Sequence, residues 1–425
     1  MFKSENVADG VRVVCIETDK YKTAELDISM ALPLDEKGAA NALAIYLLKR
    51  SCKAYPDFTV LHGKLDELYG ASLGASVGKY GDSQILSLGI TCLDDKFSLD
   101  ESSIIEEAIE LLSGMLFNPN VRCKSFGKEN FETEKRLMLQ RILDEQDDKR
   151  IYATQQLIKN MFDGEPYGRN KYGTQEEINA VKMADVYQAW QNMLLKSRIQ
   201  ITCVGSIPAE RVIEIFRKKF AKLQRTPVEM KSVFTPKAEA SKRFEERLPM
   251  NQGKFVMGYR TGMTHNHDNE FAERIAVDIF GGGTYSKLFT VIREKMSLCY
   301  YCRATLVTGK GFVLVDCGID TDKEEPATKG IMQQLEAVKN GDFEDDVLAS
   351  SKRSLRERMT FSTPDGILSW YAGQITDEEL RTPESMIENI EKVTKQEVMD
   401  CAAKMSLDTV FMLAADEPEG EKDAD

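Results

Sequence analysis

Apolar and polar positions follow two patterns that recur along the chain. Apolar residues at every third or fourth position predict helices, and short alternating or continuous apolar runs predict strands. The residues 178–193, INAVKMADVYQAWQNM, have the helical period and lead into the apolar run RIQITCVG at 198–205. The residues 390–405, IEKVTKQEVMDCAAKM, align with the first block without a gap and lead into TVFMLAA at 409–415. The pattern therefore predicts a helix followed by a strand that occurs twice.

Earlier elements repeat in the same order. The helical segment 126–142 is similar to 343–359, and two alternating strand patterns end in Gly-Ile at 89–90 and 318–319, each followed within a few residues by Asp-Lys. Identical residues in the helical segments are Phe126 with Phe343, Lys135 with Lys352, Arg136 with Arg353 and Arg141 with Arg358. Three matches in one order are typical of an internal duplication. We therefore expect an α+β fold of two homologous domains, each an antiparallel sheet packed by long helices.

The repeats also suggest where the domains begin and end. We expect the first domain at 1–222 and the second at 241–417. The segment between them, 223–240, has two prolines and mixed charge, which favours an exposed linker. The end of the chain, 418–425, is a short acidic tail.

Composition narrows the class of protein. A chain of 425 residues with 42% apolar content can fill more than one core. The net charge of -13 argues against a nucleic-acid partner, because phosphate binding needs basic stripes. The N-terminus lacks the pattern of a signal peptide, and no run approaches the ~18 apolar residues of a membrane span. We therefore expect a cytoplasmic protein with no membrane span.

Cysteine and histidine offer little for redox or metal chemistry. The nine cysteines mostly stand singly in apolar runs, which favours reduced thiols. Cys299 and Cys302 form a C-x-x-C motif, but on a regular strand a separation of three residues puts the two thiols on opposite faces. The histidines are His62, His265 and His267, and none of them has the H-x-x-E-H or H-E-x-x-H spacing that holds catalytic zinc.

Two further motifs lack the context that their chemistry requires. The segment 70–74 fits G-x-S-x-G, but a helical pattern precedes it and a strand pattern follows, the reverse of a nucleophile elbow. The glycines at 281–283 have no G-K-[ST] after them, so we expect a tight corner between helices. Arg293 and Tyr300 could stabilise an oxyanion, or they could be a surface ion-pair residue and a core aromatic.

The segment GGGTYSKLFTVIREKMSLCYY at 281–301 resembles the second-half signature of the inverzincin peptidases, the family of pitrilysin, insulinase and the mitochondrial processing peptidase. That signature has a Gly-rich corner, then S-x-L-F, R-E-K and L-x-Y, which here end in Arg293-Glu294-Lys295 and Leu298-Cys299-Tyr300. In the first half, PYGRNKYGTQEEI at 166–178 is similar to the family's P-x-G-x-x-x-x-G-T-x-E-x-I segment. The resemblance covers nearly the whole chain and implies the duplicated fold of a processing peptidase in a clamshell-type assembly.

The resemblance also shows what this chain has lost. The family carries H-x-x-E-H on its first helix, and a glutamate on a later helix completes the zinc site. Aligning the first helix here, GAANALAIYLLKRSC, puts Ala42, Ile45 and Tyr46 at the positions of His, Glu and His, while Glu134 stands at the third-ligand position. One carboxylate cannot hold catalytic zinc, so we expect no zinc on this chain and interpret Glu134 as a helix-face ion pair or cap.

The retained residues suggest a role. In the family, the residues matched by Arg293 and Tyr300 bind the substrate carbonyl and stabilise the tetrahedral oxyanion. The resemblance is to the zinc-silent subunit of bacterial heterodimeric members, which pairs with a homologous subunit that carries the zinc. It implies a non-catalytic chain that binds a peptide or unfolded segment and supplies Arg293 and Tyr300 to the partner. The alternative is an inactive homologue that serves as a structural or scaffold subunit.

Overall fold

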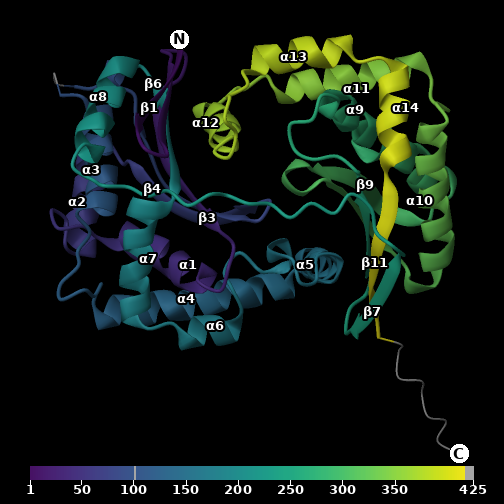
Figure 1. The fold of residues 1–425 in the computed structure, drawn as a ribbon, viewed down its shortest axis with the longest axis horizontal. Helices are drawn as coiled ribbons and strands as arrows, with labels where there is room; N and C mark the ends of the chain where they lie inside the picture. The colour runs from purple at the N-terminus through teal and green to yellow at the C-terminus, as the bar shows by residue number, and fades with distance from the viewer. Residues whose placement is uncertain (100–101, 417–425) are drawn as a thin grey trace, which may run out of the picture. The chain divides into compact units, whose positions relative to one another are not determined.

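The computed structural model describes residues 1–99 and 102–416, so the expected acidic tail at 418–425 lies outside the described residues. The chain divides into two compact units, each built around one sheet (Figure 1). The first unit comprises residues 1–143, 169–231 and 361–380; the second comprises 144–168, 232–360 and 381 onward. No helix among the described residues is long and apolar enough to cross a membrane.

The first sheet has six strands in the order β1-β2-β6-β3-β5-β4. The strands are β1 (Phe2–Ala8), β2 (Val11–Glu17), β3 (Thr23–Pro33), β4 (Ser72–Tyr80), β5 (Ser83–Leu93) and β6 (Arg198–Gly205). β2 and β6 pair in parallel, and every other neighbouring pair is antiparallel. Its helices are α1 (Gly38–Arg50), α2 (Phe58–Glu67), α3 (Ile104–Phe117), α4 (Lys128–Asp147), α6 (Gln175–Ala180), α7 (Met183–Lys196) and α8 (Ala209–Phe220).

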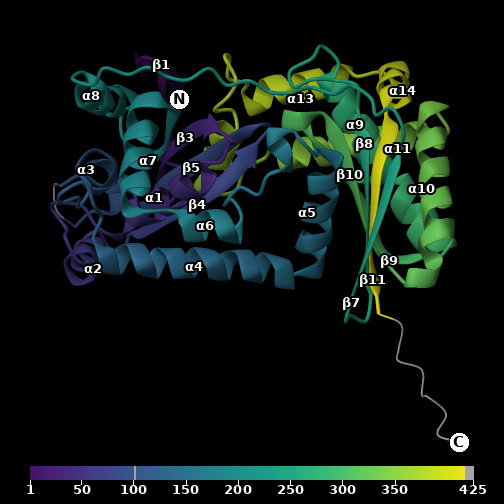
Figure 2. The ribbon, with the colours of Figure 1, turned by 60° about the horizontal axis from the view of Figure 1, so that its bottom comes forward.

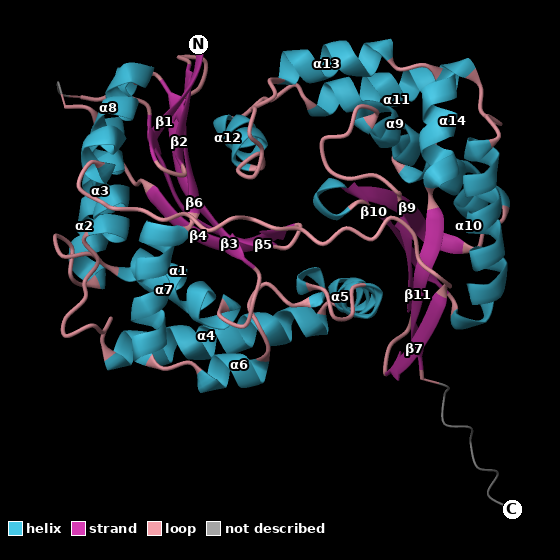
Figure 3. Cartoon of the chain, viewed as in Figure 1, coloured by secondary structure: helices cyan, strands magenta, loops and turns pink. Residues whose placement is uncertain are grey.

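The second sheet repeats five of these strands in the order β7-β11-β8-β10-β9 (Figure 3). The strands are β7 (Lys242–Leu248), β8 (Gly253–Arg260), β9 (Cys299–Val307), β10 (Phe312–Ile319) and β11 (Ser406–Ala415). β7 and β11 are parallel and the others antiparallel, as in β2-β6-β3-β5-β4 of the first sheet. Its helices are α9 (Glu270–Gly281), α10 (Glu324–Lys339), α11 (Asp345–Arg358), α13 (Pro383–Lys392) and α14 (Lys395–Lys404). The predicted α+β fold and its duplication are therefore confirmed.

The two aligned sequence blocks begin their last helices in the same way. In α7 the carboxylate of Asp185 accepts the backbone N–H of Lys182 at 2.8 Å, and in α14 the carboxylate of Glu397 accepts that of Thr394 at 2.7 Å. An acidic residue three positions after the N-cap thus satisfies an N–H that would otherwise have no partner at the helix start. The repeat preserves this local signal although the capping residues differ.

Each unit also contains one helix that belongs to the other half of the sequence. α5 (Lys149–Met161) packs on β8 and β11, where its Ala153 and Leu157 are fully buried beside Val256. α12 (Pro364–Ala372) packs on β6 and β3, where its Tyr371 carbonyl accepts a hydrogen bond of 2.5 Å from Gln200. The cores therefore use segments from both halves of the chain, and the domain boundaries expected from the sequence stay a prediction.

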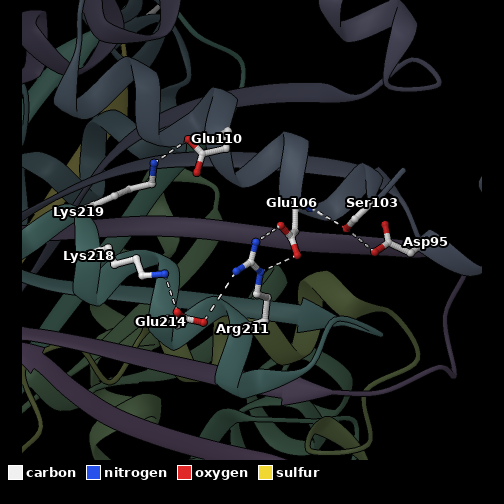
Figure 4. A network of polar contacts seen from close by, with 8 residues as sticks. All are labelled: Asp95, Ser103, Glu106, Glu110, Arg211, Glu214, Lys218 and Lys219. Carbon is white, nitrogen blue, oxygen red and sulfur yellow. Dashed lines mark hydrogen bonds and ion pairs between the residues drawn. The ribbon is translucent and has the colours of Figure 1, made fainter. Parts of the chain in front are cut away.

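A polar network lies over the outer helices of the first sheet (Figure 4). Arg211 of α8 donates two hydrogen bonds of 2.7 Å to Glu106 of α3, and Lys219 lies 2.7 Å from Glu110. These pairs are exposed, so water and salt screen them and they add little to stability. Burial of the apolar face of α8, including Phe216, contributes more to holding this helix in place.

Candidate functional site

The first helix, α1, contributes core side chains at the three positions that the sequence alignment matched to zinc ligands. Ala42 and Ile45 are fully buried in the core of the first unit. Tyr46 is 8% exposed, and burial raises the pKa of its phenol to about 12. At neutral pH Tyr46 is therefore a neutral phenol, and none of the three residues offers a strong metal ligand.

Glu134 is held between two arginines. It lies on α4 with 5% of its surface exposed, and its Oε1 accepts a hydrogen bond of 2.7 Å from Arg50, the last residue of α1. Its Oε2 is 3.8 Å from Nη1 of Arg141, which lies about two turns further along α4. The guanidinium of Arg141 lies over the ring of Tyr46, 3.9 Å from the ring centroid. Glu134 thus takes part in a buried ion pair.

These residues border a cavity of about 740 Å³ lined by residues of α1, α2, α4 and the start of β4. Figure 2 shows these four elements in the ribbon. Catalytic zinc needs three protein ligands, whereas Glu134 is already neutralised by arginine. His62 is the one histidine among the residues that line this cavity, and its ring centroid is 3.9 Å from that of Phe58. No group of three or more His, Cys, Asp or Glu residues in the described part of the chain could hold a metal. The residues present do not fit catalytic zinc.

The other two histidines belong to the second unit, in the turn before α9. Nε2 of His267 lies 3.1 Å from a carboxylate oxygen of Glu273, and its Nδ1 accepts the backbone N–H of Asn269. These contacts fix a turn that leads into the helix. They give His267 a local structural role.

Arg293 lies on an irregular helix in the second unit. The segment η3 (Leu288–Lys295) has π-helical hydrogen bonding, and it buries Leu288 and Ile292 against the core. The Arg293 side chain is 42% exposed, with its Nε 3.6 Å from Glu294 and its guanidinium 4.6 Å from the Phe289 ring centroid. Short π-helical segments are frequent at functional sites, and this one leaves the guanidinium open to solvent.

Tyr300 lies at a bulge in the edge strand β9. In the pairing with β10, Tyr301 opposes Gly318 and Cys299 opposes Ile319, so Tyr300 is the extra residue. The side chain of Tyr300 is 66% exposed. Just before the strand, Ser297 has a φ of +51°, a left-handed conformation that is costly for a residue with a Cβ. Bulges of this kind re-aim a side chain out of the regular strand pattern.

The structure thus places both predicted residues on consecutive elements of one unit, and both are exposed. No hydrogen bond, ion pair or ring contact joins Arg293 to Tyr300 in the described structure. The π-helical turn, the left-handed serine and the bulge lie within one short segment, 288–300. Irregular backbone concentrated in this way is costly, and it tends to occur where a binding surface requires it.

The bulge also corrects the expectation for the C-x-x-C motif. Because one extra residue lies between them, Cys299 and Cys302 are on the same face of β9, and their thiols are within hydrogen-bond reach. Cys302 is directly opposite Cys317, with the two sulfurs 2.7 Å apart. Burial raises the pKa of both thiols above the usual range, which favours the protonated form. Every cysteine of the chain, all within the described residues, is a free thiol.

Arg50 and Arg141 were missed as site residues by reasoning from the sequence. A signal was available for Arg141, because the repeat aligns it with Arg358. In the second unit, Arg358 of α11 donates a hydrogen bond of 3.0 Å to Asp278 of α9. In both repeats an arginine of the later long helix reaches the first helix, and the equivalence of α4 with α11 could have indicated it.

Comparisons with known proteins agree with this fold. The profile of a family described as "Peptidase M16 inactive domain" matches residues 180–355. The chain is 30% identical to the "Probable inactive metalloprotease YmfF" of Bacillus subtilis (strain 168) over 412 residues, which is 96% of each protein.

Solved structures give the same result. A conserved protein from Enterococcus faecalis V583 aligns with a TM-score of 0.88 and 25% identity, over 98% of this chain and 100% of that one. A peptidase M16 inactive domain from Pseudomonas fluorescens aligns with a TM-score of 0.80 and 19% identity, over 98% of both chains. The latter likeness concerns the fold alone.

Proposed function

The chain belongs to the M16 peptidase family, as an inactive homologue of its metallopeptidases, and on that premise we propose that it is the non-catalytic subunit of a heterodimeric zinc metallopeptidase. In this proposal it binds a peptide or unfolded segment and supplies Arg293 and Tyr300 to the active site of a zinc-bearing homologous subunit. The observation that carries the proposal is the exposure of both side chains on the irregular segment 288–300, in a chain whose first helix offers no zinc ligands.

The chemistry of Arg293 and Tyr300 suits a site in which one subunit holds zinc and the other supplies hydrogen-bond donors. Zinc in the partner would supply the activated water, while the oxyanion that forms on the scissile carbonyl needs hydrogen-bond donors. The guanidinium of Arg293 donates as a cation, and the phenol of Tyr300 donates a single O–H. Neither group can activate water by itself, so this chain needs a partner to support turnover.

An open sheet edge supports the peptide-binding part of the proposal. β4 is the last strand of the first sheet, and its outer backbone groups have no strand partner among the described residues. Its sequence, SLGASVGKY, is rich in small side chains, with two serines, one alanine and the glycines Gly74 and Gly78. A peptide can add to such an edge through backbone hydrogen bonds with little steric hindrance.

The proposal is tested by measuring peptide turnover by the two subunits assembled together. The chain is purified together with a homologous subunit that carries H-x-x-E-H, and cleavage of a fluorogenic peptide is measured under saturating conditions. Arg293→Ala or Tyr300→Phe should lower kcat by about 100-fold to 1000-fold, as expected for one oxyanion donor. Size-exclusion chromatography checks that the pair stays assembled.

Two matched variants serve as controls. Arg356→Ala removes an exposed arginine of α11, and Tyr301→Phe removes the neighbouring phenol, which bonds to Asp316 at 3.1 Å. Both should keep kcat within about threefold of the unaltered pair, since neither donates to the substrate in this proposal. If the assembled pair loses less than threefold activity with Arg293→Ala and Tyr300→Phe, the shared site is refuted and the scaffold role is favoured.

A further inference from the structure

In the wall of the cavity of the first unit, two arginines stand beside one buried carboxylate. Arg50 and Arg141 share the single buried carboxylate of Glu134, and their side chains are 33% and 32% exposed. Only Arg50 is within hydrogen-bond distance of that carboxylate. The 3.8 Å between Nη1 of Arg141 and Oε2 of Glu134 is too long for a hydrogen bond, and both of these buried atoms are without a hydrogen-bond partner in the described structure.

Glu134 offsets only one of the two cations, and the exposed parts of both guanidinium groups border the cavity, where an added anion could offset the second. The guanidinium of Arg141 cannot easily turn away, because it stacks on the ring of Tyr46. Arg50 is fixed by its hydrogen bond to Glu134 and by its place at the end of α1. Two oriented guanidinium groups with free N–H donors match the two oxygens of a carboxylate.

The rest of the cavity limits what kind of anion could enter. Its apolar wall includes Leu61, Leu65 and Leu137, and its opening reaches the start of β4 at Ser72. Exposed carboxylates also line it, namely Asp57, Asp66 and Glu129. Their repulsion disfavours a polyanion, whereas a single carboxylate joined to an apolar group can lie between the arginines and the leucines.

We propose that this cavity, which stands where zinc would be held in the catalytic relatives, binds one carboxylate of a peptide through Arg50 and Arg141. The inference rests on the proposed peptide-binding function and adds the chemical class of the ligand. The carboxylate is either the C-terminus of the peptide or an Asp or Glu side chain next to an apolar residue. A peptide that adds to β4 could reach the cavity, since the strand begins at its wall.

The test measures binding to the purified full-length chain alone, by fluorescence anisotropy of dye-labelled apolar hexapeptides. One pair differs only in a C-terminal acid or amide, and a second amidated pair differs only in Glu or Gln at the penultimate position. In at least one pair the acid should bind about 10-fold to 100-fold more tightly, the range for hydrogen bonds to a charged group. If the peptides that differ at the C-terminus show the difference in affinity, the bound carboxylate is the C-terminus. If the Glu and Gln peptides show it, the bound carboxylate is a side chain.

Variants of the arginines test whether they cause the tighter binding of the acid peptide. Arg141→Gln should reduce the preference for the acid to below threefold, whereas Arg136→Gln, an exposed arginine on the same helix, should keep it. Thermal unfolding of each variant checks that it is folded. If Arg141→Gln fails to fold, the comparison of acid with amide on the unaltered chain still decides the matter.

Equal affinity for acid and amide in both pairs, absence of binding to every peptide, or an undiminished preference in Arg141→Gln would each overturn the inference. The proposed function is judged separately, from kcat of the Arg293 and Tyr300 variants in the reconstituted pair. Loss of turnover in those variants together with equal affinity for acid and amide would keep the shared site and reject the carboxylate cavity.

Discussion

The ion pair between Arg50 and Glu134 is expected to stabilise the first unit, because the carboxylate of Glu134 is buried. Arg50→Met removes the cation that is 2.7 Å from Glu134 and keeps a long apolar side chain. The carboxylate left behind is 5% exposed, so water cannot solvate it fully. Breaking a buried pair in this way costs about 3 to 5 kcal/mol. Arg141 remains 3.8 Å from the other oxygen, so we expect about 3 kcal/mol, the lower end of that range.

The assay can report on the first unit alone. Both tryptophans of the chain, Trp190 of α7 and Trp370 of α12, belong to that unit. Urea unfolding followed by tryptophan fluorescence therefore measures the free energy of unfolding where the substitution is made. Lys3→Met, which breaks an exposed ion pair with Glu210 in the same unit, is the matched control and should leave the free energy of unfolding nearly unchanged.

A double variant tests whether the unpaired carboxylate of Glu134 causes the loss of stability in Arg50→Met. Arg50→Met combined with Glu134→Gln should be more stable than Arg50→Met alone by about 1 kcal/mol or more, because no buried carboxylate is then left unpaired. A loss below 1 kcal/mol in Arg50→Met would refute the reasoning. So would strictly additive effects in the double variant, since they would mean that the two groups do not interact.

Three further predictions concern the rest of the fold. Gly258→Ala should destabilise the second unit by about 1 to 3 kcal/mol, because the new Cβ would lie 2.5 Å from the sulfur of Met161 in α5. Faster hydrogen exchange of the α5 amides would show the destabilisation, and unchanged exchange would contradict it. Burial raises the pKa of Asp27 to about 7, so the folded state retains a proton that the unfolded state loses near pH 4, and stability should fall as pH rises from about 4 to 7. Asp27→Asn should flatten that slope in urea unfolding at several pH values, and an unchanged slope would exclude Asp27 as its source. Cys123 is exposed while Cys317 is fully buried, so alkylation of the native chain followed by mass spectrometry should modify Cys123 first, and equal rates would contradict the packing.

Local sequence patterns indicated much of the fold. The helical block 178–193 forms α6 and α7, and 390–405 lies in α13 and α14, because apolar spacing and an acid after the N-cap both act within a few residues. The loss of zinc ligands could also be read from the sequence, since alanine and isoleucine offer no donor in any fold. For Arg293 and Tyr300 the sequence predicted the residue types, while their exposure depends on the π-helical turn and the bulge.

Tertiary structure alone decided the features that depend on residues far apart in the chain. The period of apolar residues cannot tell which sheet a helix covers, so α5 and α12 were not assigned to the cores that they complete. A strand pattern of period two cannot reveal a bulge, so the sequence placed Cys299 and Cys302 on opposite faces, and one extra residue in the register reversed that result. By itself the sequence determined a duplicated α+β chain that has lost its zinc ligands. Packing between distant segments determined that two arginines surround Glu134, because only the folded chain brings the end of α1 to the middle of α4 at one cavity.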